Sequence, residues 1–314
     1  MITRQRLQLD DGFVGGADAP ISVKRVMDNV VVLDITFHKW GNTRQGDLKK
    51  VDTQADKKRL KLTKTLVALK EYDLVTNYVN SIRAWLTAVS LPSPLKRGTY
   101  LVPVASVARV SAYLDEVGEK YKAVVQGFVD VYPALVRAAE DELKDQFVAA
   151  NYDTADKVAS EFYIDRRFID FGLPNVDKVG QSVWEAEKAR AEKTWASAID
   201  TIQDALRMGF RDLVDHLADK LEPKPDGTRK VFRDSNITNI LEWIDAFKTR
   251  NVLGDNELAS LVAQAERVLR GKKPDEVKKT IGAGGGIAGE MVRIKTALDK
   301  LLVDAPKRRI SFDD

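Results

Sequence analysis

Apolar and polar positions alternate with a helical period over most of this chain. Three long stretches have apolar residues at every third or fourth position, as a helix with one buried face does: about 54–90, 107–147 and 177–221. Four shorter stretches have the same spacing: about 236–249, 255–271, 274–281 and 288–303. Because a helix over 177–221 would be roughly 60 Å long, the pattern predicts an elongated helical bundle.

Two short runs have a different pattern, which predicts β-structure. Residues 30–38, "VVVLDITFH", are mostly β-branched or aromatic, and residues 99–103, "TYLVP", follow a segment rich in proline. If these two runs pair, they form a small two-stranded β element. The predicted fold class is therefore mainly α, an elongated helical bundle with a small two-stranded β element.

Local signals refine the expected elements. Asn236 and Asp255 are candidate N-caps, and Pro133 predicts a kink or break near 129–133. Residues 152–174 are expected to form one short helix and a loop. Three parts follow along the chain: an N-terminal arm over 1–28, a helical domain with the minor β element over 29–175, and a long helix with a C-terminal helical bundle over 176–314.

Composition narrows the classes of function. The chain has 314 residues, of which 44% are hydrophobic and 31% charged, as in an ordinary folded protein. It contains no cysteine, which excludes disulfides, thiolate zinc sites and a cysteine nucleophile, and fits a reducing cytoplasm. The expected location is therefore cytoplasmic. No apolar run approaches 18 residues, so no membrane-spanning helix is expected.

A glycine-rich segment, "KTIGAGGGIAGE" over 279–290, resembles a chemical motif. Gly284, Gly286 and Gly289 satisfy the G-x-G-x-x-G pattern of dinucleotide sites. That pattern needs a preceding apolar strand, whereas the residues before it, "KPDEVKKT", are charged and helix-like. A hinge or loop between helices, formed by Gly282, Gly284, Gly285 and Gly286, is the favoured interpretation. A nucleotide-dependent enzyme that uses the segment at 282–289 remains an alternative.

Charged clusters supply the remaining binding candidates. Arg166 and Arg167 lie in "YIDRRFIDFG" and could bind an anion, although an ion-pair cluster at a helix end is the favoured interpretation. Two groups of basic residues could contact nucleic acid: Lys57, Lys58, Arg59, Lys61 and Lys64, and near the end of the chain Lys307, Arg308 and Arg309. Acidic residues lie among the first group, and 50 basic against 47 acidic residues leave a net charge of only +3. A nucleic-acid partner is therefore an alternative, not the favoured prediction.

Residues for catalysis are sparse. The two histidines, His38 and His216, lie far apart in the sequence, and no G-x-S-x-G nucleophile elbow occurs. Carboxylates cluster in charged helical runs, where a solvated helix face is the usual explanation. The sequence therefore predicts no catalytic residues, no metal site and no cofactor.

The first half of the chain resembles a domain family of unknown function found in bacterial, phage and plasmid proteins. The resemblance covers residues 28–172 and rests on three motifs: "VVVLDITFHKWG", "LPSPLKRGTYLVP" and "FIDFGLP". Many proteins of this family accompany AAA+ ATPases of the MoxR type, so the resemblance implies an AAA+ ATPase as a candidate partner and no catalytic residues. Together with the long amphipathic helices, it predicts a non-enzymatic interaction or assembly protein that binds another protein or itself.

Overall fold

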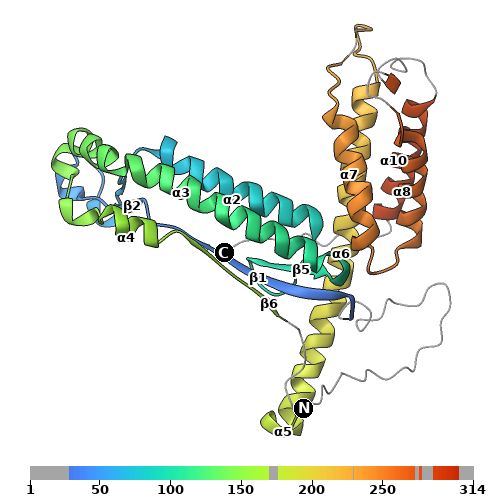
Figure 1. The fold of residues 1–314 in the computed structure, drawn as a ribbon, viewed down its shortest axis with the longest axis horizontal. Helices are drawn as coiled ribbons and strands as arrows, with labels where there is room; N and C mark the ends of the chain where they lie inside the picture. The colour runs from blue at the N-terminus through green and yellow to red at the C-terminus, as the bar shows by residue number, and fades with distance from the viewer. Residues whose placement is uncertain (1–27, 170–175, 229, 273–275, 278–285, 304–314) are drawn as a thin grey trace. The chain divides into compact units, whose positions relative to one another are not determined.

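The computed structural model describes residues 28–169, 176–228, 230–272, 276–277 and 286–303. The protein is mostly helical, as predicted, and has a small antiparallel sheet. Figure 1 shows the elements. The helices of more than three residues are α2 (Leu69–Val89), α3 (Val107–Leu143), α4 (Ala155–Ser160), α5 (Val176–Val179), α6 (Gln181–Leu221), α7 (Ser235–Arg250), α8 (Asn256–Leu269) and α10 (Ile287–Val303).

The β-structure is larger than the sequence indicates. The predicted strands at 30–38 and 99–103 are β1 (Val30–His38) and β5 (Thr99–Pro103), and they are neighbours in the sheet. Two further strands join them, β4 (Leu91–Pro92) and β6 (Tyr163–Ile169), so the order is β4-β5-β1-β6 and the predicted two-stranded element is corrected to four strands. A separate pair, β2 (Thr43–Gln45) and β3 (Thr63–Thr65), is antiparallel.

Several predicted boundaries are wrong. Residues 54–68 form no α-helix: they contain a short 3-10 helix at Lys57–Arg59 and strand β3, and the helix begins only at Leu69. Of the kink or break predicted near 129–133, the break does not occur, because the exposed Pro133 lies inside the continuous α3. The loop predicted near 163–169 is strand β6. Asn236 is not the N-cap of α7, because Asp234 holds that position. Asp255 is the N-cap of α8, as predicted.

The chain divides into two compact units, each built from separate stretches of sequence. One unit contains Leu33–Thr87 and Val107–Phe168, and the other contains Ala88–Ser106 and the described residues of 28–32 and 169–303. In the first unit, α2 and α3 lie side by side, and Tyr78 of α2 donates a hydrogen bond to the Val117 carbonyl of α3 at 3.4 Å. An apolar face on each helix, with Val75 and Phe128 among its residues, forms the core of this unit.

Buried hydroxyl and indole groups in this first unit have hydrogen-bond partners. Trp40 is 2% exposed, and its indole N–H donates to Asp153 at 2.9 Å. The Tyr72 hydroxyl donates to the Trp40 carbonyl at 2.7 Å, and the Tyr121 hydroxyl donates to the His38 carbonyl at 3.3 Å. These bonds join the end of β1 to α2, α3 and the segment before α4. Trp40 is therefore a central packing residue of the unit.

The buried phenol of Tyr121 leads to a pH prediction. Burial raises the pKa of Tyr121 to about 12, and the neighbouring Tyr72 adds to the shift. An unfolded tyrosine has a pKa of about 10, so stability that is fully present below pH 10 is lost as the pH rises toward 12. The loss from this one group is about 1.4 kcal/mol per pH unit. Between pH 10 and 11.5, we expect Tyr121→Phe to lose less unfolding free energy than the unmodified chain in urea titrations. An equal loss in both proteins would contradict this assignment.

The second unit is organised around α6. Its buried residues recur at helical spacing along one face: Trp195, Ile199, Ile202, Leu206, Phe210, Val214, Leu217 and Leu221. Helices α7, α8 and α10 contribute apolar residues to the same core, for example Ile240, Val262 and Ile294. Val30, Val32, Leu91 and Leu101 of the sheet belong to this cluster as well. The predicted stripe on the long helix is therefore buried within the chain.

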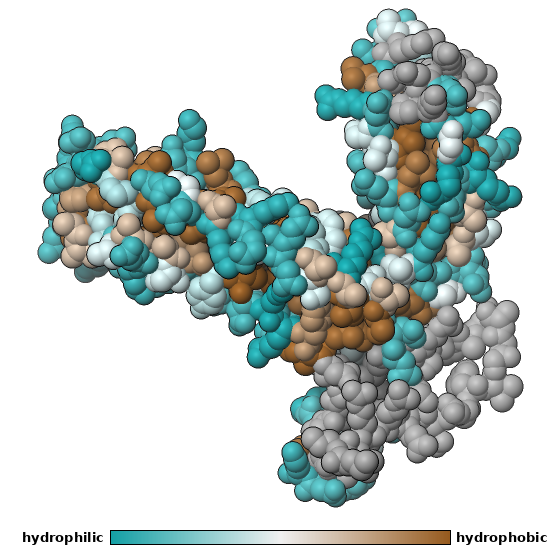
Figure 2. All heavy atoms as spheres, viewed as in Figure 1, coloured by the Kyte–Doolittle hydropathy of each residue, from teal (hydrophilic) through white to brown (hydrophobic). Residues whose placement is uncertain are grey.

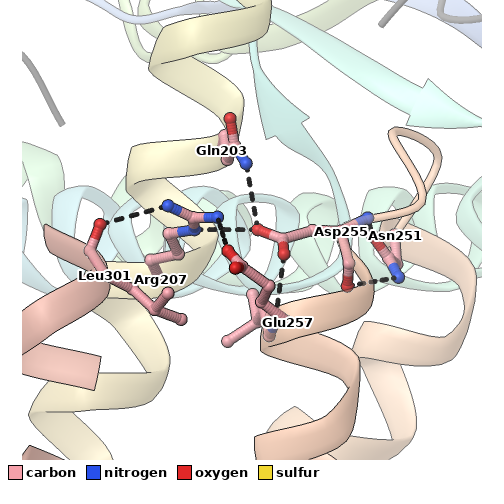
Figure 3. A network of polar contacts seen from close by, with 7 residues as sticks. Gln203, Arg207, Asn251, Asp255, Glu257 and Leu301 are labelled. Carbon is pink, nitrogen blue, oxygen red and sulfur yellow. Dashed lines mark hydrogen bonds and ion pairs between the residues drawn. The ribbon is translucent and has the colours of Figure 1, made fainter. Parts of the chain in front are cut away.

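A polar network lies in this helical unit (Figure 3). The Asp255 carboxylate accepts a hydrogen bond from the Leu258 N–H at 3.0 Å, so it caps α8. It also accepts from Arg207 Nε at 2.8 Å and from Gln203 Nε2 at 3.2 Å, both on α6. Arg207 in turn donates to the Leu301 carbonyl of α10 at 3.1 Å. This one buried ion pair therefore links three helices.

Hydrogen bonding controls the charge of this carboxyl group. Burial raises the pKa of Asp255, but the hydrogen bonds from Arg207, the Leu258 N–H and Gln203 outweigh burial and lower that pKa below its ordinary value. Glu257 completes the network at its rim, because Arg207 Nη2 lies 3.3 Å from its carboxylate and the Glu257 side chain is 70% exposed.

No helix in the described ranges is both long enough and apolar enough to cross a membrane.

Candidate functional site

The two edge strands of the four-stranded sheet differ in how well they could pair with a strand of another chain. At one end, β4 has only two residues, and one of them is Pro92, which has no N–H to donate. At the other end, β6 has seven residues and contains no proline. An end strand leaves half of its backbone N–H and C=O groups without a strand partner, and it is therefore a template for another strand. Among the residues that the structure describes, β6 is therefore the longer edge strand without a partner on its outer side.

One face of β6 packs inward. Alternate residues of a strand point to opposite faces, and Ile164 and Arg166 share one of them. Ile164 packs against the core of the first unit. Arg166 reaches helix α3, where its Nη1 donates to the Ser111 carbonyl at 3.3 Å and its Nη2 pairs with Asp115. Arg166 therefore fixes β6 to α3.

The other face of β6 is more exposed and carries Tyr163, Asp165 and Arg167. The Tyr163 ring stacks on His38 of β1, with ring centroids 4.0 Å apart and planes 9° apart. Arg167 donates from Nη2 and Nε to Asp34 of β1, at 3.1 and 3.3 Å. The Asp34 carboxylate is buried, so Arg167 compensates a charge that would be costly to bury alone. Both contacts hold β6 against β1.

Asp165 differs from its two arginine neighbours. It is exposed, and among the residues that the structure describes it has no ion-pair partner. Tyr163 and Phe168, near the two ends of the strand, are 50% and 37% exposed. Figure 2 shows hydrophobic side chains that reach the surface over the strands of the sheet. The strand therefore presents an exposed aromatic residue near each end, Tyr163 on one face and Phe168 on the other, and near its centre a carboxylate without an ion-pair partner among the described residues.

The anion-binding candidates Arg166 and Arg167 thus lie in a strand, on opposite faces, and each pairs with a carboxylate of its own chain. The ion-pair interpretation fits these contacts, although the pairs lie in a strand and not at a helix end. The partners Asp34 and Asp115 come from segments 133 and 51 residues away, so the sequence alone could not reveal them.

The first group of basic candidates lies between β2 and β3, except Lys64, which is in β3. Lys57, Lys58, Arg59 and Lys61 are exposed, and Asp56 caps their short 3-10 helix by accepting from the Lys58 N–H at 3.0 Å. Lys64 is different, because it is 7% exposed and its ammonium donates to the Gln146 carbonyl. Lys64 therefore anchors β3 to the segment after α3. Lys307, Arg308 and Arg309 lie outside the described residues.

Of the glycine segment, only its last part is described. Gly286 has a φ of +69°, a conformation that favours glycine, and its carbonyl accepts from the Glu290 N–H at 3.1 Å. Gly286 thus lies at the beginning of α10. Gly282, Gly284 and Gly285 lie outside the described residues, as do residues 1–27 of the arm predicted over 1–28 and most of the helix predicted at 274–281.

A second surface feature is a groove of about 290 Å³ between the start of α2 and the end of α3. Its lining is mostly apolar and includes Leu66, Leu69 and Leu135, with Glu142 as the charged member. Among the described residues, no cluster of three or more histidine, aspartate or glutamate side chains could hold a metal ion. At the edge of β6, another chain could be recognised through backbone hydrogen bonds, an aromatic surface and one carboxylate.

No protein-family model, no curated protein and no solved structure matches this chain. The resemblance of residues 28–172 to the family that accompanies AAA+ ATPases stays a prediction.

Proposed function

We propose that this protein acts by binding another protein chain, and that the free edge of β6 is its binding surface. The observation that carries the proposal is the contrast between the two sheet ends, a two-residue strand with proline and a seven-residue strand without it. Strand addition at such an edge gains affinity from main-chain hydrogen bonds and specificity from the side chains that flank them. The exposed Tyr163 and Phe168 supply such side chains.

Charged residues on an edge strand often serve to prevent association with another strand, and β6 carries three of them: Asp165, Arg166 and Arg167. Arg166 and Arg167 are each neutralised by a carboxylate of the same chain. Only Asp165 remains for an incoming strand, which can satisfy it with one basic residue. The charges therefore select a partner strand and do not repel every strand.

Other parts of the proposal come from the sequence. From helix length and the family resemblance, we also expect a non-enzymatic assembly role, an elongated shape, a phage or plasmid context and an AAA+ ATPase partner. The long stripe on α6 supplies little surface for a partner, because its residues are buried in the core of its own unit. The sheet edge is therefore a better location for binding than the long helix.

Nucleic-acid binding is the second candidate function. The exposed Lys57, Lys58, Arg59 and Lys61 lie together on one segment and favour it. Contacts to phosphate weaken steeply with salt, so DNA and RNA binding measured at about 50 and 200 mM salt would identify this function. Affinity that falls steeply and disappears in a Lys57→Ala/Lys58→Ala/Arg59→Ala variant would replace the protein-binding proposal.

The test of the proposed function is affinity capture from cells that make the protein, with a matched pair of variants. Phe168→Lys adds a charge to the edge of β6, whereas Leu74→Lys makes the same kind of change on α2, where Leu74 is 64% exposed. Loss of an aromatic contact at an interface commonly costs about 2 kcal/mol, so we expect Phe168→Lys to reduce specific capture at least about tenfold. Leu74→Lys should leave capture unchanged. Equal capture by both variants would reject β6 as the binding surface.

A further inference from the structure

The sequence of β6 is nearly symmetric in its chemistry about Arg166. The strand reads Tyr-Ile-Asp-Arg-Arg-Phe-Ile, with an aromatic or aliphatic pair at each end and charges in the centre. If two copies of this strand pair antiparallel about Arg166, Tyr163 lies opposite Ile169 and Ile164 lies opposite Phe168. In the same register, Asp165 of each copy lies opposite Arg167 of the other.

In this register, opposite charges lie opposite each other on the exposed face of β6. Residues directly opposite in an antiparallel pair lie on the same face of the sheet, and their Cβ atoms are about 4.5–5.5 Å apart. Asp165 and Arg167 share the exposed face of β6, so each copy places its unpaired carboxylate beside the guanidinium of the other. Opposite charges in this position stabilise a strand pair. Two such pairs form because the arrangement is two-fold symmetric.

Arg167 has donors left for this second carboxylate. A guanidinium has five N–H groups, and Arg167 uses Nε and Nη2 for Asp34. Its side chain is 67% exposed, so it can bind Asp34 of its own chain and Asp165 of a second copy together.

The central position is the least favourable contact in this register, because Arg166 lies opposite itself. Like charges directly opposite each other destabilise a strand pair. Each Arg166 is already held by Asp115 and the Ser111 carbonyl of its own α3, on the other face of the strand. The two arginines therefore meet as neutralised ion pairs and not as free cations.

We infer that the partner of β6 is a second copy of this chain, paired antiparallel about Arg166 with reciprocal Asp165–Arg167 ion pairs. The inference rests on the proposed function, whose binding surface it uses. A stable dimer interface normally buries about 1,200–2,000 Å², more than one seven-residue strand pair supplies. The association is therefore expected to be weak and to depend on protein concentration.

The chain contains no cysteine, so single cysteines report this register cleanly. In the proposed pair, residue 166 lies opposite itself at a Cα–Cα distance of about 4.5–5.5 Å, which a disulfide can span. Residue 163 lies opposite 169, so two copies of residue 163 are roughly 20 Å apart. Under mild oxidation, Arg166→Cys should form a covalent dimer and Tyr163→Cys should stay monomeric on a non-reducing gel. Equal crosslinking of the two variants, or none in either, overturns the inference.

A second measurement keeps the test valid if Arg166→Cys does not fold. Light scattering over a range of concentrations should show the unmodified chain moving from monomer to dimer. Asp165→Lys replaces both attractive pairs with repulsive ones, and it should raise the dimer dissociation constant at least about tenfold. A monomer at every concentration, with Phe168→Lys still abolishing capture of a different protein, would reject self-pairing and leave the proposed function standing. If the chain is a monomer at every concentration and Phe168→Lys leaves capture unchanged, both the self-pairing and the proposed function are rejected.

Discussion

Replacing Asp255 with alanine is expected to lower the free energy of unfolding by about 3 to 5 kcal/mol. The carboxylate caps α8, accepts from Gln203 and pairs with Arg207, whose side chain is only 11% exposed. Alanine removes all three interactions and leaves the Arg207 guanidinium buried without this partner. Urea denaturation followed by circular dichroism measures the change.

Glu257→Ala is the matched control, because Glu257 pairs with the same arginine from a largely exposed position. Exposed ion pairs contribute about 0 to 1 kcal/mol, so this variant should stay within that range. The pKa of Asp255 is lowered in the folded protein, so its contribution is present above the unfolded pKa and is lost as the pH falls through the folded value. The difference between Asp255→Ala and the unmodified chain should therefore shrink below about pH 4. Equal effects of Asp255→Ala and Glu257→Ala at neutral pH would show that the network does not hold these helices together.

Trp40→Ala is expected to have a comparable effect in the other unit. Truncation of a buried tryptophan typically costs about 3 to 5 kcal/mol, since packing contacts are lost and a cavity remains. Here the change also removes the donor to Asp153, and Tyr132 loses the edge-to-face ring contact that lies at 5.4 Å. Melting temperature and the urea midpoint both report the loss.

Trp184→Ala provides the control for residue type. Trp184 is only partly buried, and a cation–π contact with Lys188 is among its interactions. We expect this variant to lose about 1 kcal/mol or less, the range of an exposed cation–π contact. A loss after Trp40→Ala no larger than that after Trp184→Ala would mean that Trp40 does not organise its unit.

Periodicity predicts those elements of this fold that local sequence determines. The sequence predicts both the apolar stripe on α6 and the β-branched run of β1. Each element buries one face, and its backbone geometry sets the spacing of the residues on that face. The cap at Asp255 was readable for the same reason, since an N-cap acts within three residues. Its second role, as the partner of Arg207 on α6, joins positions 48 residues apart and leaves no local signal.

Strand β6 shows where sequence reasoning failed. Residues 163–167 alternate between exposed and partly buried positions, but both faces of the strand carry a charged residue, so the sequence shows no apolar stripe. The aromatic and β-branched residues at 163, 164, 168 and 169 favour a strand, but the two central arginines interrupt this pattern. Likewise, Leu62 and Leu66 continued the spacing of α2 backward, although Leu66 belongs to the core next to β3 and not to a helix. In both β6 and the segment around Leu66, contacts with distant segments determine the structure.

Amide hydrogen exchange across β6 reports whether another strand pairs with this edge of the sheet. We expect alternate amides of residues 163–169 to exchange more slowly when the partner is bound, or at high concentration if the partner is a second copy, because a new strand accepts their hydrogen bonds. Exposed amides elsewhere, such as those of the segment at 57–61, should keep their rates. Protection confined to the segment at 57–61, with unchanged exchange in β6, would show that the partner binds the basic segment and not the edge of the sheet.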